Sequence, residues 1–308
     1  MEFNGGKEEA EVWAGFEEAS KHSKAKAMLD LFLSLDSIDS SDAIPAGLEA
    51  FEEMFSQEQF ERAAFVARIL AAELSKLERY EEAQMLVDRS LSNSLWLSEF
   101  EIGMLLYSRG RIKDYLGAFE QARSDFQQSV SQLKSVDRKL AGYASKELAE
   151  ACLKIQDNTG ALSALRFAIA CFEEFGEAGP TGHAKRRLGE SLLEQRDFVT
   201  AEKNLRDAVA ILHFMEWEEE WRLAQLALAK VLFEFGKLSQ SKQIIDELMK
   251  LRSDPKMQAI CAEAAFYARR VQSRLGSRRL PESELDALIA VLKAAGLSDL
   301  AESAKAFA

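Results

Sequence analysis

The stretch Arg186–Val209, RRLGESLLEQRDFVTAEKNLRDAV, places large and small residues at helical intervals on both sides of a short polar break. Before the break stands the pair Leu188 and Gly189. After the break, the small Ala201 is followed four positions later by the larger Leu205. Small residues let two helix axes approach closely, and large residues fill the space beside the crossing. The stretch therefore predicts two helices that pack tightly across a short turn.

The same arrangement recurs along the chain at a nearly constant period. The small residue of the second helix recurs at steps of 39 and then 40 residues, as Ala83, Ala122, Ala161, Ala201 and Ser241. A larger residue follows each by four positions, as Val87, Phe126, Leu165, Leu205 and Ile245. The first helix repeats its large-small pair, except that the second copy has Arg109 before Gly110. Five copies between Glu58 and Leu251 predict a repeat array.

Composition agrees with an array of helices. A chain of 308 residues exceeds the size of most single cores, so it forms either several domains or a solenoid. Only 4 prolines and 16 glycines are present, and no segment alternates apolar and polar residues as a strand would. We predict an all-α protein with three regions. These are capping helices over residues 1–57, the repeat array over 58–256, and a final repeat with capping helices over 257–308.

The repeat resembles the tetratricopeptide repeat (TPR), which has a large-small pair in its first helix, an aromatic in the turn, and alanine, a large residue and alanine in its second helix. The usual period of that family is about 34 residues, so this chain resembles a long-period variant of about 40 residues. The resemblance implies a right-handed α-solenoid of helix pairs with capping helices. A generic array of antiparallel helices is the alternative.

The sequence offers little for catalysis. It contains no nucleophile elbow, zinc-protease motif or phosphate loop, and its three histidines and three cysteines lack metal-ligand spacing. Cys152, Cys171 and Cys261 lie in apolar helical runs, which favours buried thiols over ligands. The stretch EWEEEW, Glu216–Trp221, groups four carboxylates and two tryptophans. It is either a carboxylate site or, in the interpretation we favour, the acidic first turn of a helix. We expect no enzyme, no cofactor and no metal.

Charge suggests which part of the array is functional. The net charge of −12 argues against a general nucleic-acid surface. The resemblance implies that the first helices line a concave binding wall, and its positions in the first three copies carry five basic residues against two acidic ones. The implied groove residues are Phe65, Arg68, Lys76, Met104, Tyr107, Arg111, Tyr115, Tyr143, Lys146, Lys154 and Arg186. Glutamate follows Lys146 and Arg186 by four positions where a chaperone-type carboxylate clamp would need asparagine, so such a clamp is not expected.

These observations predict an interaction scaffold or adaptor that binds an acidic peptide or helical segment of a partner protein in the groove. The alternative is the helical sensor region of a signalling protein that binds a small ligand or peptide. Met1–Phe16 lacks the basic and apolar regions of a signal peptide, and no apolar run is long enough to span a bilayer. We therefore expect a cytoplasmic protein without membrane or nucleic-acid partners, which can form a homo-oligomer.

Overall fold

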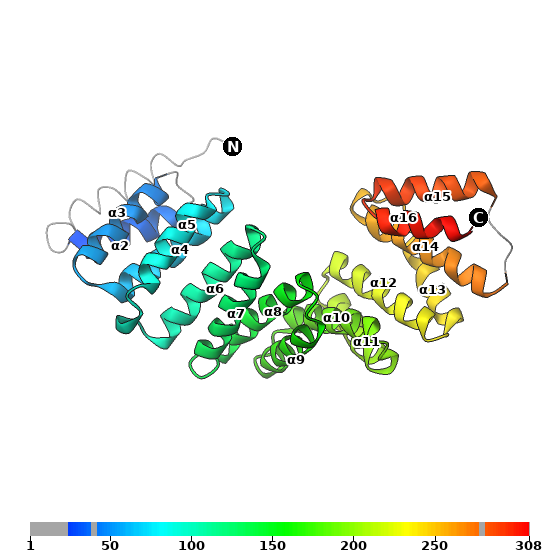
Figure 1. Cartoon of the computed structure of the whole chain (residues 1–308), viewed down its shortest axis with the longest axis horizontal. Coiled ribbons are helices and arrows are strands. Elements are labelled where there is room, and N and C mark those ends of the chain that lie inside the picture. Colours follow the sequence, from blue (N-terminus) through cyan, green and yellow to red (C-terminus); the bar gives the residue numbers. More distant parts are fainter. Residues whose placement is uncertain (1–23, 38–41, 277–280, 308) are drawn as a thin grey trace. The chain divides into compact units, whose positions relative to one another are not determined.

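The computed structural model describes residues 24–37, 42–276 and 281–307. Within these ranges the chain forms fifteen α-helices and short 3₁₀ turns, without any β-strand. The chain divides into two compact units, Met1–Ala161 and Leu162–Ala308, and the boundary falls in the first turn of α9. Figure 1 follows the helices in order along the chain. Each unit is described by itself.

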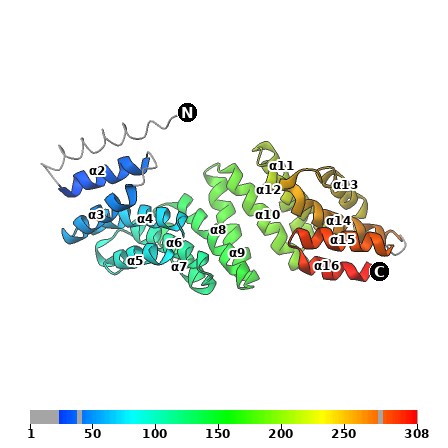
Figure 2. The same ribbon diagram turned by 90° about the horizontal axis from the view of Figure 1, so that it is seen from above.

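Unit 1 consists of antiparallel helices in which each helix packs on its neighbours in sequence. Figure 2 shows α2 beside α3 at its N-terminal end. The helices of this unit are α2 (Lys24–Ser37), α3 (Ala43–Ser56), α4 (Phe60–Lys76), α5 (Tyr80–Leu91), α6 (Glu99–Tyr115), α7 (Phe119–Leu133) and α8 (Arg138–Lys154). In repeat terms, α4, α6 and α8 are first helices, and α5 and α7 are second helices.

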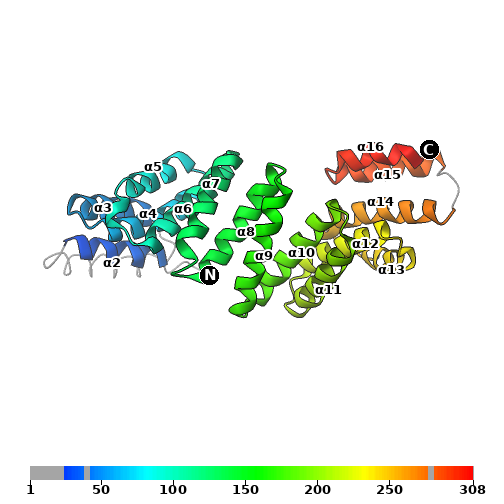
Figure 3. The same ribbon diagram turned by 60° about the horizontal axis from the view of Figure 1, so that its bottom comes forward.

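Unit 2 continues the same alternation. Its helices are α9 (Asn158–Glu174), α10 (Ala178–Glu194), α11 (Phe198–Phe214), α12 (Glu218–Glu234), α13 (Leu238–Met249), α14 (Gln258–Arg274), α15 (Glu282–Ala294) and α16 (Ser298–Ala304). Figure 3 shows the last two helices side by side. Pro281 precedes α15 and Gly296 follows it in the left-handed region, at φ 76°. Proline at a helix start and glycine after a helix end are the usual positions of these residues.

The helices end in a recurring backbone turn. One residue after each of several helices has positive φ, and from Gln156 to Gly236 such a residue occurs at every twentieth position. In the α10–α11 turn, Arg196 has φ 61°, its N–H donates to the Leu193 carbonyl, and the Asp197 N–H donates to the Leu192 carbonyl at 3.0 Å. These bonds satisfy carbonyls that a helix end leaves open. The regular turn explains why both halves of the repeat have similar lengths.

The predicted register is confirmed by burial. The five repeating small residues, from Ala83 to Ser241, are all 0% exposed, and the larger residues four positions later are at most 1% exposed. Gly189 shows how tight the crossings are, because a Cβ added there would collide with the side chain of Leu205. In the fifth copy, serine replaces alanine, and its buried hydroxyl has a partner: Ser241 Oγ donates a hydrogen bond to the Ala229 carbonyl of α12 at 2.8 Å.

Arg109, the departure from the pattern in the second copy, is explained by a charged partner in the next helix. Its guanidinium makes two hydrogen bonds with the Asp125 carboxylate, at 2.9 and 2.8 Å, and a third with Asp88 at 2.8 Å. Lys113 also contacts Asp125, at 2.7 Å. The Asp125 side chain is only 3% exposed. Burial opposes the charge of Arg109, but the bonds to Asp125 and Asp88 prevail and raise its pKa. An ion-pair cluster thus occupies the crossing that is apolar in the other copies.

The register makes a direct stability prediction. Replacing the fully buried Ala201 with leucine should overpack the α10–α11 crossing and lower the free energy of unfolding by about 1–3 kcal/mol. Ala210→Leu is the matched control, because Ala210 is exposed on the same helix. Denaturant unfolding of the two variants measures the difference. Equal stabilities would contradict the register.

The flanking helices also agree with the sequence where the structure describes them. The apolar patterns of residues 44–55, 257–275 and 298–307 correspond to α3, to α14 with its preceding 3₁₀ turn, and to α16 with its following 3₁₀ turn. The apolar pattern of residues 8–35 is seen from Lys24 onward as α2. Residues 8–23, with His22, and residues 38–41 of the polar stretch 36–43 lie outside the described residues.

Candidate functional site

One cavity of unit 1 collects four of the predicted groove residues. It has a volume of about 260 Å³ and lies between α4 and α6, beside the first turn of α5. Helix α6 contributes Tyr107, Arg111 and Tyr115, which share one face because they are four residues apart. The full lining is Ala71, Ala72, Ser75, Lys76, Glu78, Tyr80, Tyr107, Ser108, Arg111 and Tyr115. Two cations and one carboxylate therefore line a cavity in a protein whose net charge is −12.

Tyrosine rings form much of this cavity. Tyr115 is 51% exposed and stacks on Tyr80, with ring centroids 5.4 Å apart and an interplanar angle of 22°. Tyr107 is half-buried, and its ring centroid lies 6.0 Å from that of Phe126 in the core. Burial raises the pKa of Tyr107 to about 12, so its phenol stays neutral at physiological pH. The three rings together offer aromatic surface to a ligand in the cavity.

Arg111 is the distinctive charge of the cavity. Its Nη2 donates a hydrogen bond of 2.8 Å to the Tyr115 hydroxyl, and its guanidinium carbon lies 5.8 Å from the centroid of the same ring. Burial works against its charge, but the bond to Tyr115, the nearby Tyr107 and the Glu147 carboxylate outweigh this and raise its pKa. The guanidinium is thus held by a hydroxyl group, and it forms no ion pair with a carboxylate of the described residues.

The other predicted cations of unit 1 contact carboxylates of the chain itself. Arg68 lies 3.5 Å from Glu101, Lys76 lies 2.6 Å from Glu73, Lys146 lies 3.0 Å from Glu147, and Lys154 lies 2.7 Å from Asp114. Lys76 remains 68% exposed, whereas Lys146 is only 26% exposed. The implied groove position of Lys146 is therefore only partly open to solvent. Of the five cations in this strip, Arg111 alone has no ion pair with a carboxylate of the described residues, and Lys76 is exposed but paired with Glu73.

Phe65, Met104 and Tyr143 are partly buried and do not line this cavity. Phe65 packs against the core of unit 1, and the Arg68 guanidinium lies 5.3 Å from its ring centroid. Sequence reasoning missed Tyr80, because only first-helix positions were counted and Tyr80 begins the second helix α5. The aromatic residue expected in the turn of the repeat was the signal that points to it.

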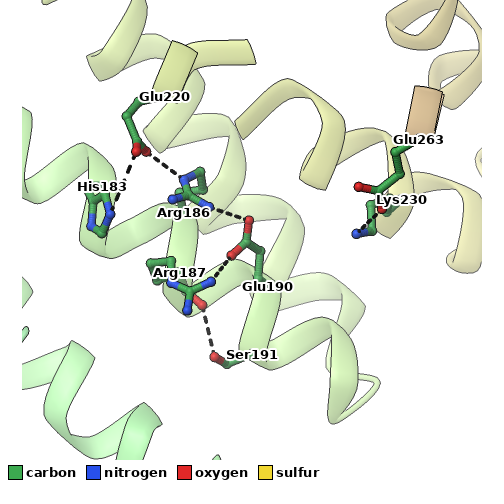
Figure 4. Close-up of polar contacts among 8 residues, drawn as sticks. All are labelled: His183, Arg186, Arg187, Glu190, Ser191, Glu220, Lys230 and Glu263. Atoms are coloured by element: carbon green, nitrogen blue, oxygen red, sulfur yellow. Dashed lines mark hydrogen bonds and ion pairs between the residues drawn. The ribbon is translucent and has the colours of Figure 1, made fainter. Parts of the chain in front are cut away.

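Arg186 belongs to unit 2 and is a structural residue. Figure 4 shows its guanidinium between two carboxylates, with bonds of 2.9 Å to Glu220 and 2.6 Å to Glu190. Arg187 bonds the second oxygen of Glu190 at 2.8 Å. Arg186 is 7% exposed, so this ion-pair network occupies its charge. The prediction that Arg186 is an open groove cation is wrong, because Glu220 comes from the neighbouring helix α12.

The EWEEEW stretch has the structural role that we favoured. Glu218, Glu219 and Glu220 form the first turn of α12, where the helix dipole favours acids. Glu218 pairs with Arg222 at 2.7 Å, and Glu220 pairs with Arg186. Trp217 lies against Gly179, where an added Cβ would be 2.6 Å from its ring. Glu220 thus links α12 to α10, and Glu218 pairs within α12.

The described residues contain neither a cluster of the ligand groups that a metal site needs nor a disulfide. Among the described residues, no group of three or more His, Cys, Asp or Glu side chains is arranged to hold a metal ion. The three cysteines are buried, as predicted, and are not joined in disulfides. Burial raises the pKa of the Cys152 thiol to about 11.

In the described part of the chain, no helix combines the length and apolar character needed to cross a membrane.

Comparison with known proteins identifies the fold. No protein-family model and no curated protein matches the sequence. Among solved structures, the chain is similar to PH0952 from Pyrococcus horikoshii, a STAND protein with a tetratricopeptide repeat sensor, with a TM-score of 0.64 and 12% identity. That match covers 92% of this chain and 46% of the other, so this chain spans less than half of PH0952.

Two further solved structures match along nearly their whole length. The apo form of RapI gives a TM-score of 0.62 at 10% identity, covering 98% of this chain and 95% of that chain. YrrB, described as a TPR protein with an unusual peptide-binding site, gives 0.52 at 14% identity, covering 68% and 95%. The chain therefore has the fold of tetratricopeptide-repeat proteins, an all-α solenoid of helix pairs, as its residues predicted.

Proposed function

We propose that this protein is a non-enzymatic interaction module, and that the α4–α6 cavity of unit 1 binds an acidic segment of a partner protein. The TPR fold supports a protein or peptide ligand, because stacked helix pairs present extended surfaces suited to peptides. YrrB, which shares the fold, is described as having a peptide-binding site. The buried free thiols favour a reducing compartment, and we place the protein in the cytoplasm.

The observation that carries the proposal is the state of Arg111. The Arg111 guanidinium, bonded to the Tyr115 hydroxyl and paired with no carboxylate of the described residues, can form a two-pronged contact with an incoming carboxylate without first breaking an ion pair. Lys76 lines the same cavity and is largely exposed, and Tyr115 offers an exposed ring beside both. Arginine and tyrosine are the residue types that dominate binding energy at interfaces. The cavity thus matches a carboxylate flanked by apolar or aromatic side chains.

The net charge of the protein affects which experiment can test acidic-peptide binding in the cavity. A protein of net charge −12 repels an acidic ligand at distances beyond the screening length, about 8 Å at physiological ionic strength. Salt weakens both this repulsion and the attraction by Arg111, so salt dependence alone does not isolate the cavity. Enrichment of acidic sequences against the net repulsion is the more informative signal.

A selection from a random peptide display library tests the proposal by offering the folded protein many candidate sequences at once. We expect the recovered peptides to be enriched in Asp and Glu over the starting library, and to carry aromatic or aliphatic neighbours. A library passed over denatured protein measures background. Recovery of basic or uncharged peptides alone would overturn the proposal.

A sensor region is the second candidate, because PH0952 carries a TPR sensor and its match covers 92% of this chain. Such a region would bind a small ligand or a peptide and regulate a linked response. Thermal stabilisation by a panel of metabolites separates the two functions, since a ligand raises the midpoint only if it binds the folded state. Stabilisation by a metabolite but by no acidic peptide would favour the sensor. The same unfolding experiment across protein concentrations tests for a homo-oligomer.

A further inference from the structure

The C-terminal part of unit 2 contains a second cavity that the peptide-binding proposal does not use. It has a volume of about 370 Å³, is partly open to solvent, and is lined by the end of α13, by α14 and by α15. Figure 2 shows these helices next to one another in this unit. Volumes of roughly 300–1,000 Å³ are typical of small-molecule sites, which are mostly apolar with a few placed polar groups. This cavity has that size and composition.

Small residues create the space. Ala262 and Ala265 on α14 and Ala287 on α15 all line the cavity. Larger apolar side chains, Leu288 and Val291 of α15 among them, form its walls. The Val291 side chain is 47% exposed, so a large apolar group of the cavity wall is in contact with solvent. The walls therefore present apolar surface that a ligand could remove from water.

Two polar side chains line the cavity. Arg252 follows α13 and Gln258 begins α14, and both are exposed. Among the described lining residues, Arg252 carries the one charge. The neighbouring Lys250 is bound to Glu247 at 2.6 Å, whereas the described part of the chain provides no ion pair for Arg252. The lining is thus mostly apolar and includes one guanidinium and one amide.

The remaining polar groups nearby are already engaged. Cys261 Sγ donates to the Leu248 carbonyl at 3.3 Å, and burial raises the pKa of this thiol, so it remains neutral. The Asp254 carboxylate accepts the Lys256 N–H at 2.9 Å and caps the following 3₁₀ turn. Neither group offers a second positive or negative anchor inside the cavity. The chemistry of the site therefore depends on Arg252 and the apolar walls.

We propose that this cavity binds a small amphiphilic carboxylate, with its hydrocarbon part between α14 and α15 and its carboxylate on Arg252. Arginine pairs with carboxylates through two parallel N–H donors, and Gln258 can donate a further hydrogen bond. The cavity volume suits a medium-length alkyl chain better than a helix or strand of a partner. The proposal is independent of the acidic-segment site in unit 1.

Calorimetric titration with decanoate tests the proposal, with decyltrimethylammonium as the probe of opposite charge. We expect saturable binding of one decanoate per chain and at least about tenfold weaker binding of the cation. The net charge of −12 favours the cation everywhere else on the surface, so general electrostatics cannot produce that preference. Equal or tighter binding of decyltrimethylammonium would overturn the proposal, and so would no binding of decanoate.

Two matched pairs of variants locate the site. Arg252→Ala should weaken decanoate binding at least about tenfold, whereas Lys250→Ala, which removes a charge in the same turn, should not. Ala287→Phe should fill the cavity and block binding, and Ala290→Phe on the exposed surface of the same helix should not. Arg111→Glu in unit 1 should leave decanoate binding unchanged. Decanoate binding that survives both Arg252→Ala and Ala287→Phe would overturn the assignment.

Discussion

Asp125→Ala should destabilise the protein by about 3 kcal/mol or more, the largest single-residue effect expected outside the apolar crossings. Asp125 is 3% exposed and holds both Arg109 and Lys113, at 2.8 and 2.7 Å. Its loss leaves two cations beside a buried crossing without their shared counter-charge. Denaturant unfolding, analysed for the free energy of unfolding in water, measures the effect.

Two companion variants separate burial from charge. Asp88 binds the same arginine at 2.8 Å but is 42% exposed, so Asp88→Ala should cost no more than about 1 kcal/mol. Combining Asp125→Ala with Arg109→Leu restores the apolar residue found in the other copies and should recover part of the lost stability, because Lys113 still lacks its partner Asp125. A cost for Asp125→Ala no larger than that for Asp88→Ala would contradict the role given to the buried cluster.

Arg111→Glu should weaken the binding of a selected acidic peptide by more than about tenfold. The reversal removes the guanidinium that the carboxylate would contact and places a like charge in the cavity. Arg111 is exposed, so the thermal midpoint should change little. Fluorescence anisotropy of a labelled peptide measures the change in affinity.

The matched control for this variant is Lys134→Glu. Lys134 is an exposed cation after α7 in the same unit, and it does not line the cavity. Both substitutions change the net charge by the same amount, so any difference in affinity belongs to the site. Equal losses in the two variants would show that only the overall charge matters.

The fold could be predicted from the sequence because the information is local and repeated. The small residue and its larger partner four positions later define one helix face, and five copies in one register leave little freedom for the packing. Ala161, Ala201 and Leu205 are accordingly all 0% exposed. The replacement of an apolar residue by Arg109 was visible in the sequence. Its compensation by Asp125, 16 residues further on, depended on how α6 packs on α7.

The candidate site was predicted only in part, for a related reason. Helical spacing places Tyr107, Arg111 and Tyr115 on one face of α6, and the structure brings them together. Spacing within one helix does not reveal partners on other helices, such as Asp114 for Lys154 or Glu220 for Arg186. Within the basic strip, long-range pairs occupy Arg68 and Lys154, whereas Lys76 and Lys146 pair with Glu73 and Glu147 close by in the sequence. The distinction between an open and an occupied cation required the three-dimensional structure.

The most direct test of the acidic-segment site is to map where a selected peptide binds. A selected acidic peptide carrying a photoreactive group beside its carboxylates would be cross-linked to the full chain, and the attachment points would be identified by mass spectrometry. The account predicts attachment to α4, to the first turn of α5 and to α6, around Lys76, Tyr80 and Arg111. Attachment confined to α10–α16 or to the exposed surface of α7, with the α4–α6 cavity unlabelled, would contradict it.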